Sequence, residues 1–174
     1  MIQTIQIGDN GGELRLAANA ATPLRFKQLF KLDLLKILSD LSQENSAELV
    51  EPITKLAYVM NMQAKGENMN ALSEDGFFEW LEGFEPMDFA YASEKIMNVY
   101  LASSQPSSVA KKKVRPTTRD DNTALLMLRA KQIGLSIEDL EQLTVGDLLD
   151  MLIEQVNDEC KYAVKATQDD FKRF

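Results

Sequence analysis

The chain has 174 residues, 45% of them hydrophobic, which is enough for one mid-sized domain or two small ones with a real core. It has no histidine and a single cysteine, so it cannot form an intrachain disulfide, a standard zinc site or a histidine general base. No apolar run is long enough to span a membrane and the first residues lack a signal-peptide pattern, so a soluble cytoplasmic protein is expected.

The net charge of −8 is distributed unevenly along the chain. Residues 1–104 contain 15 acidic and 8 basic residues, and residues 120–174 contain 12 acidic and 6 basic ones. Between these two blocks, residues 105–119 contain five basic residues and no acidic one. Two acidic blocks argue against a nucleic-acid-binding protein, which would show a basic face on a folded element.

The first predicted element is a β-hairpin. Residues 2–7 alternate in polarity, the glycine-rich segment 8–12 is a dense turn signal, and Leu14 and Leu16 share one face of the next strand. The glycines lack the lysine of a phosphate-binding P-loop, so a hairpin tip is the favoured interpretation. An isolated hairpin is only marginally stable, so it must pack on the following helices or pair with another chain.

Four helical segments are expected next, because apolar residues recur at helical spacing between cap and break signals. The first is rich in leucine, is expected to begin with Thr22 as N-cap, and is expected to break at residues 31–33. Its leucines could serve a homo-oligomer as well as a core. The third is short, aromatic and capped by Ser73. The four segments cover residues 22–41, 46–65, 74–82 and 87–102.

An aromatic group stands out in and after the third helical segment. Two interpretations of it are open: the rings form part of the core, or they form an exposed patch that another protein covers. The core is the favoured interpretation. The group consists of Phe77, Phe78, Trp80, Phe84 and Phe89.

Residues 104–119 are predicted to be a flexible basic linker, because serine, proline and lysine dominate a stretch without apolar periodicity. Three short helices follow, with N-caps expected at Asp120 or Asn122, at Ser136 and at Thr144. The predicted fold class is therefore mainly α with a small N-terminal β-hairpin. Its units are a helical domain over residues 1–103 and a small three-helix module over residues 120–174, whose tail frays.

No catalytic constellation is recognised in the sequence. The carboxylates cluster at helix starts, where they complement the helix dipole, so they are better explained as helix-terminal charges than as an acid pair. Cys160 stands beside charged neighbours and is interpreted as a spare thiol. A non-enzymatic protein without metal or cofactor is therefore expected.

Three stretches resemble tail assembly chaperones of long-tailed bacteriophages that infect Gram-positive hosts. A strand hairpin precedes Ala-Thr-Pro-Leu-Arg-Phe-Lys-Gln-Leu-Phe at residues 21–30, and Trp-Leu-Glu-Gly-Phe at residues 80–84 is similar to a Trp-Leu-x-x-Phe motif of the family. Residues 134–150 are similar to the extension of the longer, two-module family product. One departure is Lys31, which stands where the family commonly has glycine.

The resemblance implies a chaperone that keeps the tape measure protein soluble through its first domain and recruits tail tube subunits through its extension. It implies action in the cytoplasm of the infected host and absence from the mature virion, with no nucleic acid and no membrane as partner. A small helix-turn-helix DNA-binding regulator is the alternative, which the acidic residues 145–156 disfavour. The residues expected to contact partners are Arg25, Phe26, Phe77, Trp80, Phe84, Leu140, Leu148 and Leu149.

Overall fold

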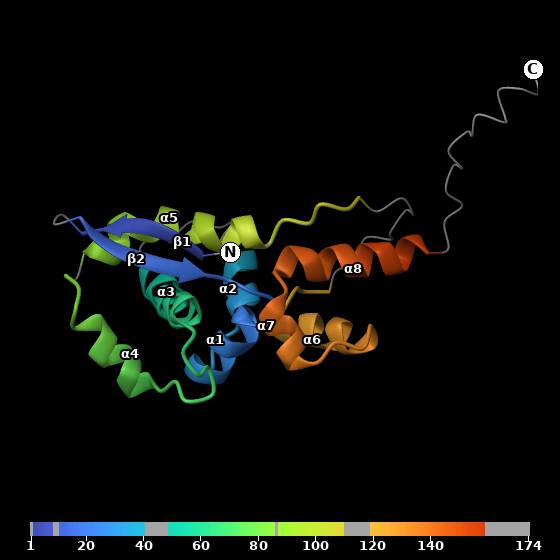
Figure 1. The fold of residues 1–174 in the computed structure, drawn as a ribbon, viewed down its shortest axis with the longest axis horizontal. Coiled ribbons are helices and arrows are strands. Elements are labelled where there is room, and N and C mark those ends of the chain that lie inside the picture. Colours follow the sequence, from blue (N-terminus) through green and yellow to red (C-terminus); the bar gives the residue numbers. More distant parts are fainter. Residues whose placement is uncertain (1, 9–10, 41–48, 86, 110–118, 159–174) are drawn as a thin grey trace, which may run out of the picture.

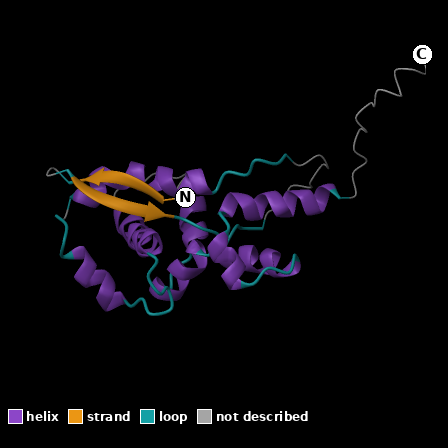
Figure 2. Cartoon of the chain, in the orientation of Figure 1, coloured by secondary structure: helices purple, strands orange, loops and turns teal. Residues whose placement is uncertain are grey.

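A computed structural model describes residues 2–8, 11–40, 49–85, 87–109 and 119–158. Within these ranges the chain is mostly helical and begins with a two-stranded sheet (Figures 1 and 2), which confirms the predicted fold class. The elements are β1 (Ile2–Ile7), β2 (Gly12–Ala17), α1 (Thr22–Phe30), α2 (Leu34–Asp40), α3 (Val50–Lys65), α4 (Glu74–Leu81), α5 (Asp88–Ser103), α6 (Thr123–Gln132), α7 (Ile137–Gln142) and α8 (Val145–Asn157).

The hairpin forms as predicted and packs on helices. β1 and β2 are antiparallel, with Ile2 opposite Ala17 and Ile7 opposite Gly12. Alternation places Leu14 and Leu16 on one face, where both are buried against the main core. β2 lies against α3 and β1 against α5 (Figure 1), so these helices supply the packing that an isolated hairpin lacks.

The main core is built around α3. Most residues of this helix are buried, and Leu56, Ala57, Val59 and Met60 are completely so. The helix ends as expected at Gly66, whose positive φ of 74° lets its N–H bond back to the last turn. The expected start near residue 46 lies outside the described residues, and the structure begins α3 at Val50.

The predicted break between the first two helices is present, and its geometry is unusual. α1 ends at Lys31, which adopts a left-handed backbone with φ 59° and whose N–H bonds to the carbonyl of Lys27. Glycine enters this region without steric cost, whereas a lysine there is uncommon. The expectation that Thr22 caps α1 is wrong: Thr22 lies inside the helix, accepts from the N–H of Asn19 and donates its hydroxyl to Gln63.

The three C-terminal helices begin at side-chain caps that the sequence indicates. The Asn122 side chain accepts from the N–H of Leu125 at the start of α6. Ser136 and Thr144 each form a capping box with an aspartate three residues later. All three predicted helices are therefore confirmed, with Asn122 rather than Asp120 as the first cap.

These helices do not stand apart from the rest of the chain. Ala20 and Ala21, which precede α1, are fully buried in one apolar cluster with Leu126, Leu140 and Leu148. The two blocks that composition separates therefore share this cluster. We call this contact of residues 19–35 with α6, α7 and α8 the module interface.

The first residues of the predicted linker also contact the C-terminal helices. The N–H groups of Ser107 and Ser108 donate to the two carboxylate oxygens of Asp150 on α8, at 3.1 and 2.6 Å. The carbonyl of Val109 accepts from Asn157 at 3.2 Å. Residues 104–109 therefore lie along α8 instead of free in solvent, because a helix carboxylate satisfies their backbone donors. Residues 110–118 lie outside the described part of the chain.

Candidate partner-binding groove

The groove is built on α4, which local signals position. Ser73 has an extended backbone, and its hydroxyl accepts from the N–H of Gly76 at 3.1 Å, as expected of an N-cap. Glu74 and Asp75 fill the first turn, where negative charge complements the helix dipole. The helix turns Phe77 inward, 4% exposed, and leaves its neighbour Phe78 59% exposed.

Phe77 ties α4 to the main core through ring contacts. Its centroid lies 5.2 Å from that of Phe30 on α1 and 5.5 Å from that of Tyr58 on α3, in edge-to-face arrangements. Such pairs are worth about 0.5–1.5 kcal/mol beyond the area they bury. The inner side of α4 is therefore firmly held.

Trp80, Phe84 and Phe89 form a second aromatic contact beside the first. Ring centroids lie 4.8 Å apart for Trp80 and Phe84, 5.3 Å for Trp80 and Phe89, and 5.0 Å for Phe84 and Phe89. The Trp80 indole N–H donates to Asn61 Oδ1 at 3.1 Å, and Asn61 Nδ2 donates to the Arg15 carbonyl at 2.7 Å. This chain of bonds fixes the tryptophan against α3 and β2.

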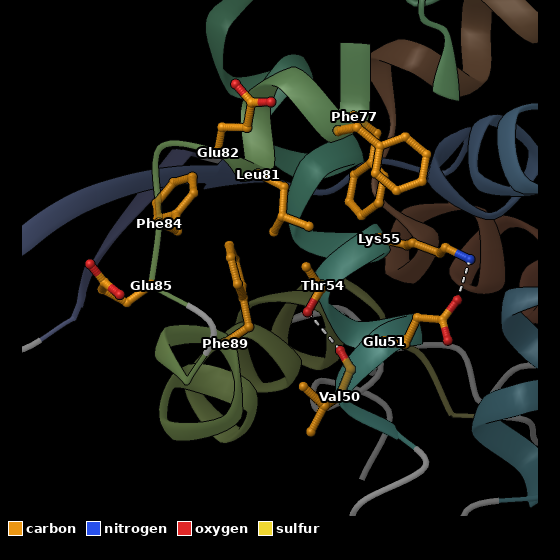
Figure 3. Close-up of a pocket in the computed structure, with 11 residues that line it drawn as sticks. Val50, Glu51, Thr54, Lys55, Phe77, Leu81, Glu82, Phe84, Glu85 and Phe89 are labelled. Atoms are coloured by element: carbon orange, nitrogen blue, oxygen red, sulfur yellow. Dashed lines mark hydrogen bonds and ion pairs between the residues drawn. The ribbon is translucent and has the colours of Figure 1, made fainter. Parts of the chain in front are cut away.

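Between α3, α4 and the start of α5 lies an open hollow of about 770 Å³, which we call the aromatic groove (Figure 3). Leu81, Phe84 and Phe89 point toward its middle, and Thr54 approaches from α3. The lining residues are Val50, Glu51, Thr54, Lys55, Phe77, Phe78, Leu81, Glu82, Phe84, Glu85 and Phe89. The groove is thus apolar inside and carries its charges at the rim.

Acidic side chains dominate that rim. Glu82 and Glu85 are exposed and make no ion pair with any residue that the structure describes. The one basic lining residue, Lys55, is engaged: its Nζ lies 2.6 Å from Glu51 Oε1 and 5.3 Å from the centroid of the Phe30 ring. The rim therefore presents uncompensated negative charge beside an apolar floor.

Within the described ranges, no three carboxylate or thiol groups gather in a way that could hold a metal ion. No helix among them is both long enough and apolar enough to cross a membrane. No protein-family model, curated protein or solved structure matches the chain. The groove, which suits non-covalent contact with an apolar side chain, is the feature from which a function can be argued.

The structure divides the aromatic residues that the sequence singled out. Phe77 and Phe89 are core, whereas Trp80 and Phe84 are half-buried and Phe84 lines the groove. Phe78 is exposed. The core interpretation therefore holds for Phe77 and Phe89, and coverage of the exposed ring of Phe78 by another protein stays a prediction.

The apolar residues outside the aromatic group that were expected to contact partners are buried or half-buried. Phe26 is fully buried in the main core, and Leu140 and Leu148 are fully buried in the cluster at the module interface. Leu149 is half-buried and lines a smaller hollow of about 430 Å³ between α2, α5, α6 and α8. In this conformation Phe26, Leu140 and Leu148 present no surface to a partner.

Arg25 is a central residue of the module interface. Its side chain is 7% exposed, and its guanidinium forms an ion pair with Glu141 on α7. It also donates to Asn70 Oδ1 at 2.6 Å and to Gln28 Oε1 at 3.1 Å. Each of the three guanidinium nitrogens therefore has an acceptor, which is what a buried charge requires.

Asp33 supplies the second charged contact across the module interface. Its carboxylate accepts from the N–H and hydroxyl of Thr123, at 3.1 and 2.9 Å, and from Lys27 Nζ at 2.8 Å. Burial disfavours its charge, but the bonds from Lys27 and Thr123 outweigh burial and lower the pKa of Asp33 below its ordinary value. The ionised carboxylate thus helps to hold α6 in place.

Sequence reasoning missed the α3 side of the groove and the polar partners at the interface. Val50 and Thr54 join Phe78 and Leu81 only through tertiary packing, and no local pattern marks them. The i,i+4 spacing of Glu51 and Lys55 could have indicated their surface pair.

Proposed function

We propose that this protein is a non-enzymatic tail assembly chaperone of a long-tailed bacteriophage, in the longer two-module form. Its first domain binds the tape measure protein and keeps it soluble in the host cytoplasm, and its C-terminal helices recruit tail tube subunits. The observation that carries the proposal is the aromatic groove, an open apolar surface on the domain that contains the motifs resembling the family.

The geometry at Lys31 gives independent support. The family that the sequence resembles commonly has glycine at this position, and the chain here adopts the left-handed conformation, φ 59°, that favours glycine. The departure at Lys31 therefore falls at a position whose backbone geometry glycine favours.

The C-terminal helices offer a separate surface for a second partner. α8 exposes the side chains of Met151 and Val156, 41% and 39% respectively, while Leu148 of the same helix is buried at the module interface. The helix also carries Asp147, Asp150 and Glu154, which would repel phosphates and disfavour the helix-turn-helix alternative.

Co-expression of the full chain with a tape measure fragment tests the proposal. The wild-type chain is expected to raise the soluble fraction of the fragment several-fold. Phe78→Ala, in the groove, is expected to remove most of this effect, whereas Leu128→Ala, an equally simple truncation of an exposed residue on α6, is expected to retain it. An unchanged soluble fraction with the wild-type chain would contradict the proposal.

The same experiment separates the two modules when a tube subunit is added. Met151→Ser combined with Val156→Ser is expected to keep the tape measure fragment soluble and to lose capture of the tube subunit. Loss of both activities would contradict the division between modules. A salt-dependent gel shift with duplex DNA would favour the DNA-binding alternative instead.

A further inference from the structure

The apolar floor and acidic rim of the aromatic groove indicate which kind of segment can bind there. We infer that it takes an α-helical segment of the client protein whose apolar face is flanked by lysine or arginine. This inference rests on the proposed function, because it specifies what the chaperone binds at the same site.

Charge complementarity is the first reason. The groove floor is aromatic and aliphatic, whereas Glu82 and Glu85 stand exposed at its edge without an ion pair in the described chain. The only lysine of the lining is already paired with Glu51. An occupant with basic residues beside its apolar face would supply the missing partners, and one with acidic residues there would be repelled.

The acidic rim also continues past the groove. A second hollow of about 720 Å³ shares Glu82, Phe84 and Glu85 with the aromatic groove and extends to the hairpin turn. It adds the exposed side chains of Met87 and Tyr91, 54% and 72% exposed, and further carboxylates at Glu13 and Asp88. A surface of this extent suits a segment of polypeptide and is larger than a single side chain needs.

The secondary structure around the groove indicates whether the bound segment is helical or extended. The lining of the aromatic groove comes from α3, α4, the start of α5 and the connection between α4 and α5, and the strand residues that line the second hollow are only those beside the hairpin turn, Ile7, Gly12 and Glu13. Helices have no free row of backbone donors and acceptors to pair with an extended peptide. Side-chain anchors at helical spacing are therefore the available mode of recognition, as in other helix-in-groove complexes.

The chain contains its own reporter for occupancy of the groove. Trp80 is the only tryptophan and packs against Phe84 and Phe89, which line the groove. A peptide that enters the groove changes the surroundings of this indole. A peptide held elsewhere on the acidic surface leaves its emission unchanged.

Two designed peptides of about 18 residues, or about five helical turns, test the inference on the full chain. Both carry leucine at helical spacing along one face; the flanking positions are lysine in one and glutamate in the other. The lysine peptide is expected to bind, to shift the Trp80 emission, and to have a dissociation constant at least about tenfold lower than that of the glutamate peptide. Equal affinities, or an unchanged Trp80 emission, would overturn the inference.

Charge-reversal variants separate a local effect from the net charge of the protein. Glu82→Lys with Glu85→Lys is expected to weaken binding of the lysine peptide about tenfold and to strengthen binding of the glutamate peptide. Glu67→Lys with Glu94→Lys changes the net charge equally at exposed positions outside the lining, and is expected to change affinity much less. Equal effects of the two double variants would overturn the inference.

Two further outcomes are informative. One would show that a second copy occupies the groove, and the other would show that the inference fails while the proposed function stands. If the full chain is dimeric, and Phe171→Ser with Phe174→Ser both dissociates the dimer and strengthens peptide binding, the groove takes the C-terminal segment of a second copy and the inference is wrong. If the Glu82→Lys, Glu85→Lys variant still keeps the tape measure fragment soluble, the inference fails while the proposed function stands.

Discussion

The module interface and the aromatic groove both combine apolar side chains with charged ones, but their charges are satisfied differently. At the module interface, Arg25 is buried and the Asp33 side chain is only 16% exposed, and each finds partners across the contact, on α7 and α6. At the groove, Glu82 and Glu85 stay in water and have no ion pair within the described chain. The charges of the first surface are satisfied within the chain, whereas those of the second are the ones that we propose a partner satisfies.

This difference separates charges that hold the fold together from charges that select a partner. A buried ion pair loses hydration, so removing one partner leaves the other stranded and costs several kcal/mol. An exposed carboxylate loses little when it is replaced, and its effect appears only when a partner arrives. Substitutions of matched chemistry at the two surfaces should therefore differ strongly in their effect on stability.

The largest expected difference is between the two engaged cations. Arg25→Met removes a buried guanidinium and leaves Glu141 and Asn70 without their donor, so the free energy of unfolding is expected to fall by about 3 kcal/mol. Lys55→Met at the groove breaks a pair with Glu51, whose side chain is 75% exposed, and is expected to cost less than about 1 kcal/mol. Urea unfolding followed by circular dichroism measures both; equal losses would remove the distinction between the surfaces.

The same contrast explains what the sequence could predict. Ser73, Asn122, Ser136 and Thr144 were recognisable as helix caps because each cap and its partner lie three residues apart. These caps and the helical periodicity predicted the starts of α4 and of the three C-terminal helices, whereas the alternating polarity and the glycine-rich turn predicted the hairpin.

The contacts across the module interface had no such local signal. Arg25 and Glu141 are separated by 116 residues, and Asp33 and Thr123 by 90. Arg25 looked like a surface cation available to a partner, and only tertiary structure shows that the partner is in the same chain. The aromatic residues were found from the sequence, but which rings face outward depends on how α4 rests on α1 and α3.

A smaller difference is expected between two glycines in helices. A Cβ added at Gly146 in α8 would lie 2.3 Å from the carbonyl oxygen of Gln105, so backbone has to move. Gly146→Ala is therefore expected to displace residues 104–109 from α8 and to cost about 2 kcal/mol. Faster hydrogen exchange at the Ser107 and Ser108 amides, which donate to Asp150, would report the displacement.

Gly76→Ala in α4 is the matched control. Its Cβ would lie 3.1 Å from the hydroxyl oxygen of Tyr58, the far end of a side chain, and alanine favours a helix over glycine by up to about 1 kcal/mol. The free energy of unfolding is therefore expected to change by less than about 1 kcal/mol. A loss as large as that for Gly146→Ala would mean that the α4 side of the groove is packed as tightly as the linker against α8.

The smallest effect concerns the charge of Asp33 and depends on pH. Because hydrogen bonds in the folded state lower the pKa of Asp33, its contribution to stability is present above the ordinary value of 3.8 and is lost as the pH falls through the lower folded value. Asp33→Asn is expected to cost about 1 kcal/mol at neutral pH, because an amide oxygen accepts more weakly than a carboxylate from Thr123 and Lys27. Below the folded pKa, the protonated wild type and the variant should converge in stability.

Hydrogen exchange at one amide assigns that pH effect to the module interface. The Ala20 N–H donates to the Leu143 carbonyl at 2.7 Å, so its protection reports whether the C-terminal helices are docked. Protection is expected to fall in Asp33→Asn at neutral pH, and in the wild type only under acid, while the buried α3 amides stay protected. If α3 loses protection in parallel, Asp33 stabilises the whole fold and the interface does not open on its own.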